Sequence, residues 1–129
     1  MLEFLIAMSA PTYQFDYGLL AERVRTVWPD AFFAPSTSPE QQRVSVGQWQ
    51  IPSRGSRDEL ALVSPQPDGT AIGIDSYSLE LAARYIALVT TLPGFPDDGT
   101  ALLLNWNGGE YEPLRPNMTS TVILAIRRR

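Results

Sequence analysis

Residues 71–106 read AIGIDSYSLELAARYIALVTTLPGFPDDGTALLLNW, and this stretch decides the fold class. The apolar runs at 71–77 and 101–106 are typical of β-strands, whereas residues 79–92 carry apolar side chains at helical spacing. The Pro-Gly pair at 93–94 ends that helix. The stretch therefore predicts a strand, a helix and a second strand of central-sheet character, in that order.

The predicted helix at 79–92 is apolar on nearly every side, and Ser76 or Ser78 is suited to cap its N-terminus. One apolar stripe consists of Leu79, Ala82, Ala83, Ile86 and Val89. A second stripe, offset around the helix, consists of Leu81, Tyr85, Leu88 and Leu92. Such a helix is either buried on most sides or presents an apolar patch to a partner. Two interpretations follow: a central covered helix, or a second stripe that binds a partner protein or forms a homodimer.

Two turn signals predict antiparallel hairpins. An Asp-Gly pair lies in the 65–70 segment, between apolar runs at 59–64 and 71–77. Asn107-Gly108-Gly109 supplies residues suited to positive φ between the 101–106 run and a return segment at 110–114. Prolines in and after this return segment place it at a sheet edge.

The other segments add a helix and more strands. Alternating aromatic residues predict a strand at 12–17, and helical spacing after Gly18 predicts a helix that Pro29 ends. We further expect a short strand or packed turn at 31–34, a loop at 35–42, a strand at 44–51 with a bulge at Gly47, and a final strand at 121–126. The predicted class is α+β: a two-layer sandwich with two helices packed on a mainly antiparallel sheet of about five to seven strands.

One domain accounts for most of the 129 residues. We expect residues 12–126 to form it, preceded by 1–11 as an N-terminal extension or a short edge strand. Met8 resembles an alternative translation start, so Met1 and Met8 are both candidates for the natural first residue. The three arginines at 127–129 are expected to form a solvated basic tail.

The chain contains no histidine, cysteine or lysine. It therefore has no imidazole, no thiolate nucleophile or metal ligand, and no lysine for a Schiff base or a phosphate loop. The chain contains ten arginines and fourteen acidic residues, which gives a formal net charge of −4. This balance argues against nucleic acid as a partner and favours a protein, with a basic protein the simplest choice. We expect no cofactor and no metal ion.

The N-terminal apolar run at 1–8 is too short to span a membrane, and it contains Glu3. It also lacks the basic residues with which a signal peptide begins. We therefore expect a cytoplasmic protein of bacterial or phage origin, with no membrane partner.

The hairpin at 105–112 is the most site-like segment, because an indole, a phenol, amides and carboxylates meet at one turn. The candidate ligand-binding residues are Asn105, Trp106, Asn107, Glu110 and Tyr111. Trp106 and Tyr111 are expected to face each other across the hairpin and form a platform of the kind on which sugars stack. The alternative is a hairpin whose aromatic pair only stabilises the sheet, with Asn-Gly selected for turn geometry.

These observations favour a small acidic non-enzymatic module that binds another protein, with no catalytic residues assigned. Its size and charge resemble those of single-domain inhibitors such as immunity proteins and anti-defence proteins, an analogy that fold alone does not decide. The alternative is a small-ligand or carbohydrate-binding domain that uses the 105–112 hairpin. An enzyme that works with carboxylates, serine or tyrosine alone comes third.

Overall fold

A seven-stranded antiparallel sheet forms one layer of the molecule. The computed structural model describes residues 2–53, 56–108 and 110–127. The strands are β1 (Leu2–Met8), β2 (Phe32–Pro35), β3 (Gly47–Ser53), β4 (Ser56–Pro65), β5 (Ala71–Ser76), β6 (Ala101–Asn107) and β7 (Glu110–Pro113). Their order across the sheet is β2-β3-β4-β5-β1-β6-β7. Each neighbouring pair is antiparallel, including the β4–β5 and β6–β7 hairpins that the two turn signals predicted.

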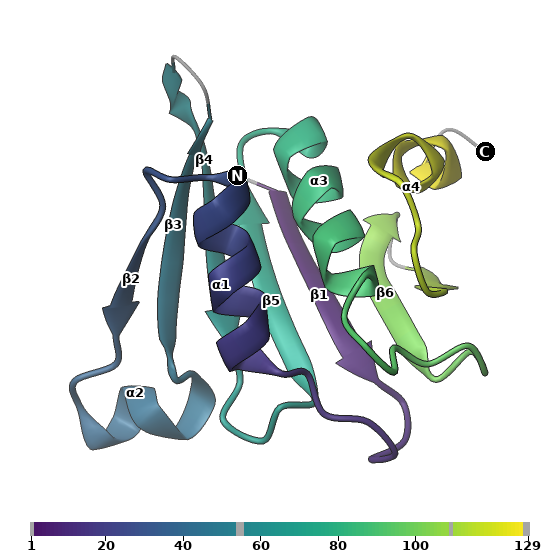
Figure 1. Ribbon diagram of the computed structural model, residues 1–129, viewed down its shortest axis with the longest axis horizontal. Coiled ribbons are helices and arrows are strands. Elements are labelled where there is room, and N and C mark those ends of the chain that lie inside the picture. Colours follow the sequence, from purple (N-terminus) through teal and green to yellow (C-terminus); the bar gives the residue numbers. More distant parts are fainter. Residues whose placement is uncertain (1, 54–55, 109, 128–129) are drawn as a thin grey trace.

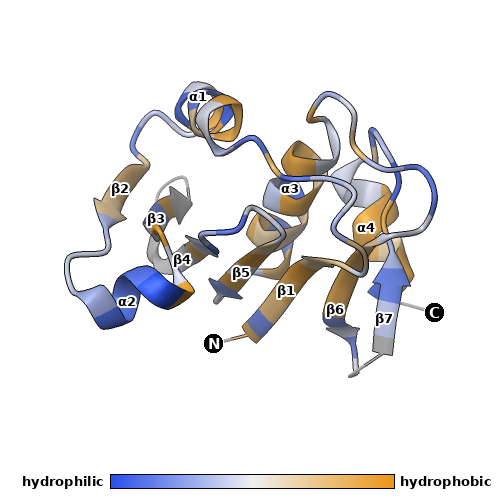
Figure 2. Ribbon diagram, turned by 90° about the horizontal axis from the view of Figure 1, so that it is seen from below, coloured by the Kyte–Doolittle hydropathy of each residue, from blue (hydrophilic) through white to orange (hydrophobic). Residues whose placement is uncertain are grey.

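Three of the four described helices form the second layer on one face of this sheet (Figures 1 and 2). The four are α1 (Tyr17–Val27), α2 (Pro39–Val44), α3 (Leu79–Thr90) and α4 (Ser120–Arg127). In Figures 1 and 2, α1, α3 and α4 lie side by side over the same face, whereas α2 stands apart near the β2 end. The predicted α+β class and its antiparallel sheet are confirmed, with four helices in the described residues where the sequence predicted two.

The N-terminal strand β1 is an interior strand. It pairs with β5 on one side and with β6 on the other, so it joins the two hairpins into one sheet. Phe4 and Ile6 point into the core and are buried. The expectation of an N-terminal extension or short edge strand at 1–11 is therefore wrong for Leu2–Met8. Burial of the helix-facing side of β1 accounts for the apolar residues Phe4 and Ile6.

The C-terminal segment is a helix, so the prediction of a final strand at 121–126 is wrong. The side chain of Thr119 accepts a hydrogen bond from the backbone N–H of Val122 at 3.2 Å and helps to start α4. Ile123 and Ile126, three residues apart, face the core, and α4 packs against α3. Burial of this helical stripe outweighs the preference of β-branched residues for strands, which depends strongly on context.

The aromatic alternation before α1 is not a strand either. Residues 13–16 are not part of a β-strand. The phenol of Tyr13 donates a hydrogen bond to the carbonyl of Pro93 at 3.1 Å. Phe15 is buried against the ring of Phe95. The alternation therefore reflects packing against the loop after α3, and Asp16 then caps α1 by accepting from the N–H of Leu19 at 3.0 Å.

Helix α2 lies where the sequence analysis expected a loop. Ser38 accepts a hydrogen bond from the N–H of Gln41 at 3.1 Å, and the Gln41 side chain accepts one from the N–H of Thr37. This is close to a capping box, and Pro39 occupies the first helical turn. The signal was present in the sequence, but the Ser, Pro and Gln content of 35–42 masked it.

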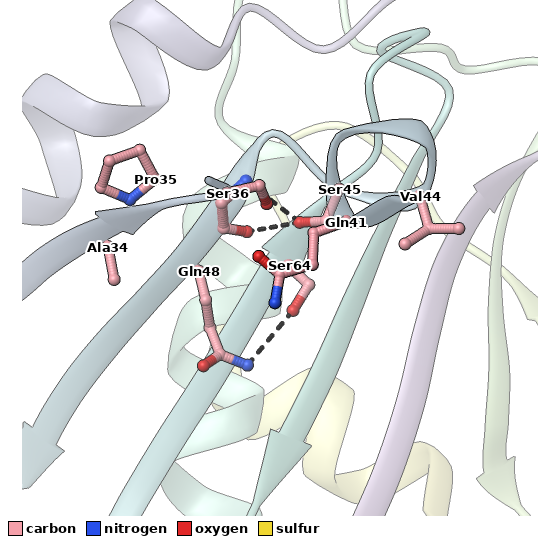
Figure 3. Close-up of a pocket in the computed structure, with 9 residues that line it drawn as sticks. Ala34, Pro35, Ser36, Gln41, Val44, Ser45, Gln48 and Ser64 are labelled. Atoms are coloured by element: carbon pink, nitrogen blue, oxygen red, sulfur yellow. Dashed lines mark hydrogen bonds between the residues drawn. The ribbon is translucent and has the colours of Figure 1, made fainter. Parts of the chain in front are cut away.

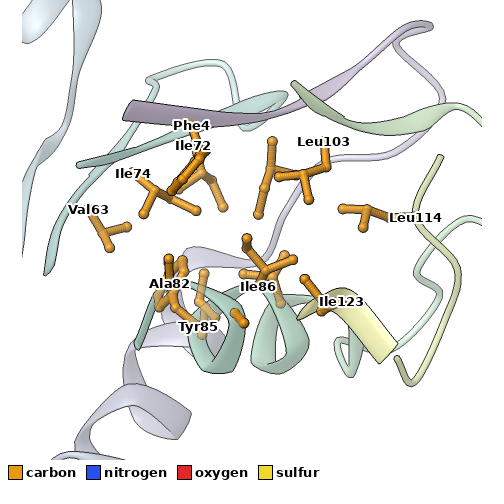
Figure 4. Close-up of a cluster of buried hydrophobic side chains, with 14 of the residues drawn as sticks. Phe4, Val63, Ile72, Ile74, Ala82, Tyr85, Ile86, Leu103, Leu114 and Ile123 are labelled. Atoms are coloured by element: carbon orange, nitrogen blue, oxygen red, sulfur yellow. The ribbon is translucent and has the colours of Figure 1, made fainter. Parts of the chain in front are cut away.

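Helix α3 lies at the centre of the core, with its capping residue Ser78 as predicted. Figure 4 shows its buried face turned toward the sheet residues Phe4, Ile72 and Ile74. Of the stripe proposed as a partner surface, Leu81, Tyr85 and Leu92 are buried inside the monomer, and Leu88 is partly buried.

The structure therefore corrects the partner-surface prediction for Leu81, Tyr85, Leu88 and Leu92. The interpretation as a central, covered helix holds, because α1 and α4 flank α3 on the sheet and cover the second stripe. No helix within the described residues is long and apolar enough to cross a membrane.

The Tyr85 hydroxyl is fully buried and has no hydrogen-bond partner among the described residues. An unpaired buried hydroxyl costs about 1–3 kcal/mol. We therefore expect Tyr85→Phe to stabilise the protein by about 1 kcal/mol, measured as the free energy of urea unfolding. Tyr85→Leu is the matched control, because it also removes the hydroxyl but leaves a cavity, and it should destabilise. A Tyr85→Phe variant less stable than wild type would mean that the hydroxyl has a partner.

Candidate functional site

The structure does not support the aromatic platform expected at the β6–β7 hairpin. Trp106 is fully buried, and its indole N–H donates a hydrogen bond to the carbonyl of Ile123 at 2.9 Å. Tyr111 lies directly opposite Leu104 and is 67% exposed. The two rings therefore lie on opposite faces of the sheet, and the platform prediction for this pair is wrong.

A bulge is the physical reason. The register of β6 and β7 shifts between Leu104 and Asn107, and Asn105 has a φ of 66°. Regular alternation would place Trp106 on the same face as Leu104, but the additional residue turns Trp106 into the core. The Asn105 side chain instead donates a hydrogen bond to the carbonyl of Glu3 at 2.8 Å.

The remaining hairpin candidates do not assemble into a site. Asn107 is partly buried and lies opposite Glu110 in the register, and the side chain of Glu110 lies outside the described part of the chain. Arg127, expected in a solvated tail, ends α4 and donates a hydrogen bond to the carbonyl of Trp106 at 2.8 Å. The other two tail arginines lie outside the described residues. Arg127 thus belongs to the packing around Trp106.

A polar hollow of about 300 Å³ lies between α2 and the ends of β2 and β3 (Figure 3). Its walls carry hydroxyls and carboxamides, including those of Gln48 and Ser64, which meet at 3.5 Å. The Ser45 hydroxyl donates to the carbonyl of Gly47 and accepts from its N–H, so it is used within the turn. None of the lining side chains is charged, so this hollow offers no group that would select a charged ligand.

The most unusual surface is the sheet face opposite α1, α3 and α4. Figure 2 shows no helix over this face along β5, β1, β6 and β7. Leu5 lies directly opposite Leu104, and Leu104 lies opposite Tyr111, so three apolar side chains cross three strands in one row. Ala7 and Leu102 form the start of a second row. We call this set (Leu5, Ala7, Leu102, Leu104 and Tyr111) the open sheet face.

Two carboxylates border the open sheet face. Glu3 lies directly opposite Asp75, at the outward positions of β1 and β5. Burial, together with the negative charge of Glu3, raises the pKa of the Asp75 carboxyl above its ordinary value. No arginine occurs in β1, β5 or β6, so these are the only charged side chains on the three strands.

Neither a metal-binding group nor a similar known protein points to a further site. The described residues contain no group of three or more acidic side chains that could hold a metal ion. No family model, no curated protein and no solved structure was found to match this chain. Function is therefore inferred from the surface chemistry of the chain itself.

Sequence reasoning missed the open sheet face because it placed residues 2–8 outside the domain. The signal was nevertheless present. A strand with one face exposed to water normally alternates apolar and polar residues, whereas β1 and the first part of β6 read LEFLIAM and ALLL. The outward positions of an uncovered sheet are polar by default, and here they are leucine and alanine.

Proposed function

We propose that this chain is a non-enzymatic protein-binding module and that its open sheet face binds a basic protein. The observation that carries the proposal is the row Leu5, Leu104 and Tyr111, on the part of the sheet face along which Figure 2 shows no helix. Contiguous apolar surface of this kind on a soluble domain commonly marks an interaction site. In size and charge the chain is comparable to small acidic inhibitors, of which immunity and anti-defence proteins are examples.

The pair Glu3 and Asp75 supplies the charge complementarity. Like charges directly opposite each other on adjacent strands destabilise a sheet. A partner that places an arginine or lysine between them would relieve this repulsion and would gain two charge-assisted hydrogen bonds. The occupant we infer therefore presents a cationic side chain next to apolar ones.

We expect Asp75→Asn to raise the stability of the free protein at neutral pH. Because the folded-state pKa of Asp75 is raised, the folded state loses stability as pH rises through that pKa, and the substitution removes this loss. The melting temperature should rise by about 1–3 °C, the shift that a few tenths of a kcal/mol produces in a domain of this size. The gain should vanish at a pH below the ordinary carboxyl range. An Asp75→Asn variant that is less stable at neutral pH would show that the pair is not repulsive.

The binding test uses the same position. The wild-type chain is immobilised and exposed to a lysate of its native host, and retained proteins are identified by mass spectrometry. We expect one basic protein in stoichiometric amount, and we expect the Glu3→Gln/Asp75→Asn double variant to bind it at least about tenfold more weakly. Glu80→Gln, at an exposed position on α3, is the matched control and should retain it.

Three results would contradict the proposal. Retention of the partner by the double variant as strongly as by the wild type would show that the open sheet face is not the site. Capture of no protein, or self-association of the chain through this face, would likewise overturn it. Weakening by salt is expected, because exposed charges contribute to the contact.

A further inference from the structure

A second, chemically different hollow lies on the helical side of the sheet. It has a volume of about 320 Å³, within the range of small-molecule sites. It lies between α1 and the β2–β3 edge of the sheet, whereas the open sheet face lies on the opposite side (Figure 2). Its lining residues are Tyr17, Gly18, Ala21, Arg25, Phe33, Val46, Trp49 and Pro65. We call it the α1 groove.

The groove exists because small residues face aromatic ones. Gly18 and Ala21 lie on the α1 wall, between the longer side chains Tyr17 and Arg25. Across from them, the rings of Phe33 and Trp49 pack at 5.3 Å between centroids. Trp49 itself is buried, so the accessible apolar wall of the hollow comes from Phe33, which is partly buried, and from Val46, which is exposed.

Among the residues whose side chains the structure describes, Arg25 is the only charged one that lines the α1 groove. Its guanidinium carbon lies 5.1 Å from the centroid of the Trp49 ring. A guanidinium held over an aromatic ring is attracted to the ring face, and it still has N–H donors with which to bind a carboxylate. This contact also holds the cation in place, so little conformational entropy is lost when an anion binds.

Tyr17 adds apolar surface but no charge. Burial raises the pKa of its phenol to about 12, so the hydroxyl is neutral at physiological pH. That hydroxyl donates to backbone carbonyls, including the carbonyl of Ala71 at 3.2 Å, and is thus used within the fold. The groove therefore combines flat apolar walls with one positive charge.

We propose that the α1 groove binds a small planar aromatic carboxylate. The ring of the ligand lies against Phe33 and Val46, and its carboxylate accepts two hydrogen bonds from Arg25. Charge complementarity selects the class, since a cation beside apolar walls favours an anion with an apolar body, and the aromatic side chain of Phe33 favours a flat ring. This proposal is independent of the protein-binding proposal, because it uses the other side of the sheet.

The test uses 2-naphthoate as the probe and follows the indole N–H signals of the three tryptophans by NMR. We expect the Trp49 signal to move on titration and the signal of Trp106, buried elsewhere, to stay. The neutral analogue 2-naphthalenemethanol and the Arg25→Gln variant should each bind at least about tenfold more weakly. Arg43→Gln, on α2, is the matched control and should bind like the wild type.

A second variant fills the groove. Ala21→Leu keeps a strong helix former on α1 and should abolish binding of 2-naphthoate. No movement of the Trp49 signal at millimolar 2-naphthoate would overturn the proposal, as would equal affinity for the neutral analogue. If Ala21→Leu does not fold, Arg25→Gln and the neutral analogue still decide the outcome.

Discussion

A chain that begins at Met8 is expected not to fold. Removal of residues 1–7 takes away most of β1, which pairs with β5 and β6. Strands β5 and β6 would lose the strand that joins them, so the sheet would be split into two parts. The buried side chains of Phe4 and Ile6 would also be lost. Each such loss costs about 2–5 kcal/mol, against a total stability of about 5–15 kcal/mol for a domain.

The measurement is the dispersion of the ¹H–¹⁵N spectrum together with urea unfolding. The truncated chain should show a collapsed spectrum and no cooperative transition. Within the full chain, Ile6→Ala should cost about 2–5 kcal/mol, whereas Leu5→Ala, on the open sheet face, should cost less. A truncated chain with a native-like spectrum would show that β1 is a dispensable addition.

The second large effect is expected at Trp106. Trp106→Ala should destabilise the protein by about 3–5 kcal/mol, because it empties a large buried site. It removes the contact with Phe4, whose ring centroid lies 4.7 Å away, and the hydrogen bond to the carbonyl of Ile123. It also removes the ring that lies under the Arg127 guanidinium. This single side chain thus joins β1, β6 and α4.

Two further variants make this prediction specific. Trp106→Phe keeps an aromatic ring but leaves the Ile123 carbonyl without its donor, so a loss of about 1–3 kcal/mol is expected. Tyr111→Ala, at the exposed position of the same hairpin, should change stability by no more than about 0.5 kcal/mol. A greater cost for Tyr111→Ala than for Trp106→Ala in urea unfolding would mean that the bulge does not place Trp106 in the core.

Local signals predicted much of the fold. The Asp-Gly turn is present, with Gly69 at a φ of 73°, and it joins β4 to β5 as expected. The Ser78 cap and the apolar spacing correctly placed α3. These features depend on residues close together in the chain, so a sequence pattern is sufficient to find them.

The errors at β1 and at the C-terminal helix share one cause, which is dependence on distant segments. The apolar run of β1 is equally suited to an edge or an interior position until its two neighbours, β5 and β6, are known. The apolar residues at 120–127 fit a strand or a helix, and the α3 surface against which they pack selects the helix. Periodicity alone does not distinguish these alternatives.

The sequence by itself determined the α+β class, the antiparallel hairpins, the central helix and the exclusion of histidine, cysteine and lysine chemistry. Only the tertiary structure decided which side chains are available to a partner. One inserted residue at Asn105 reverses the faces of Trp106 and its neighbours, and strand order turns Leu5 and Leu104 into one apolar row. Surface chemistry depends on register and strand order, and both are set by packing between segments far apart in the chain.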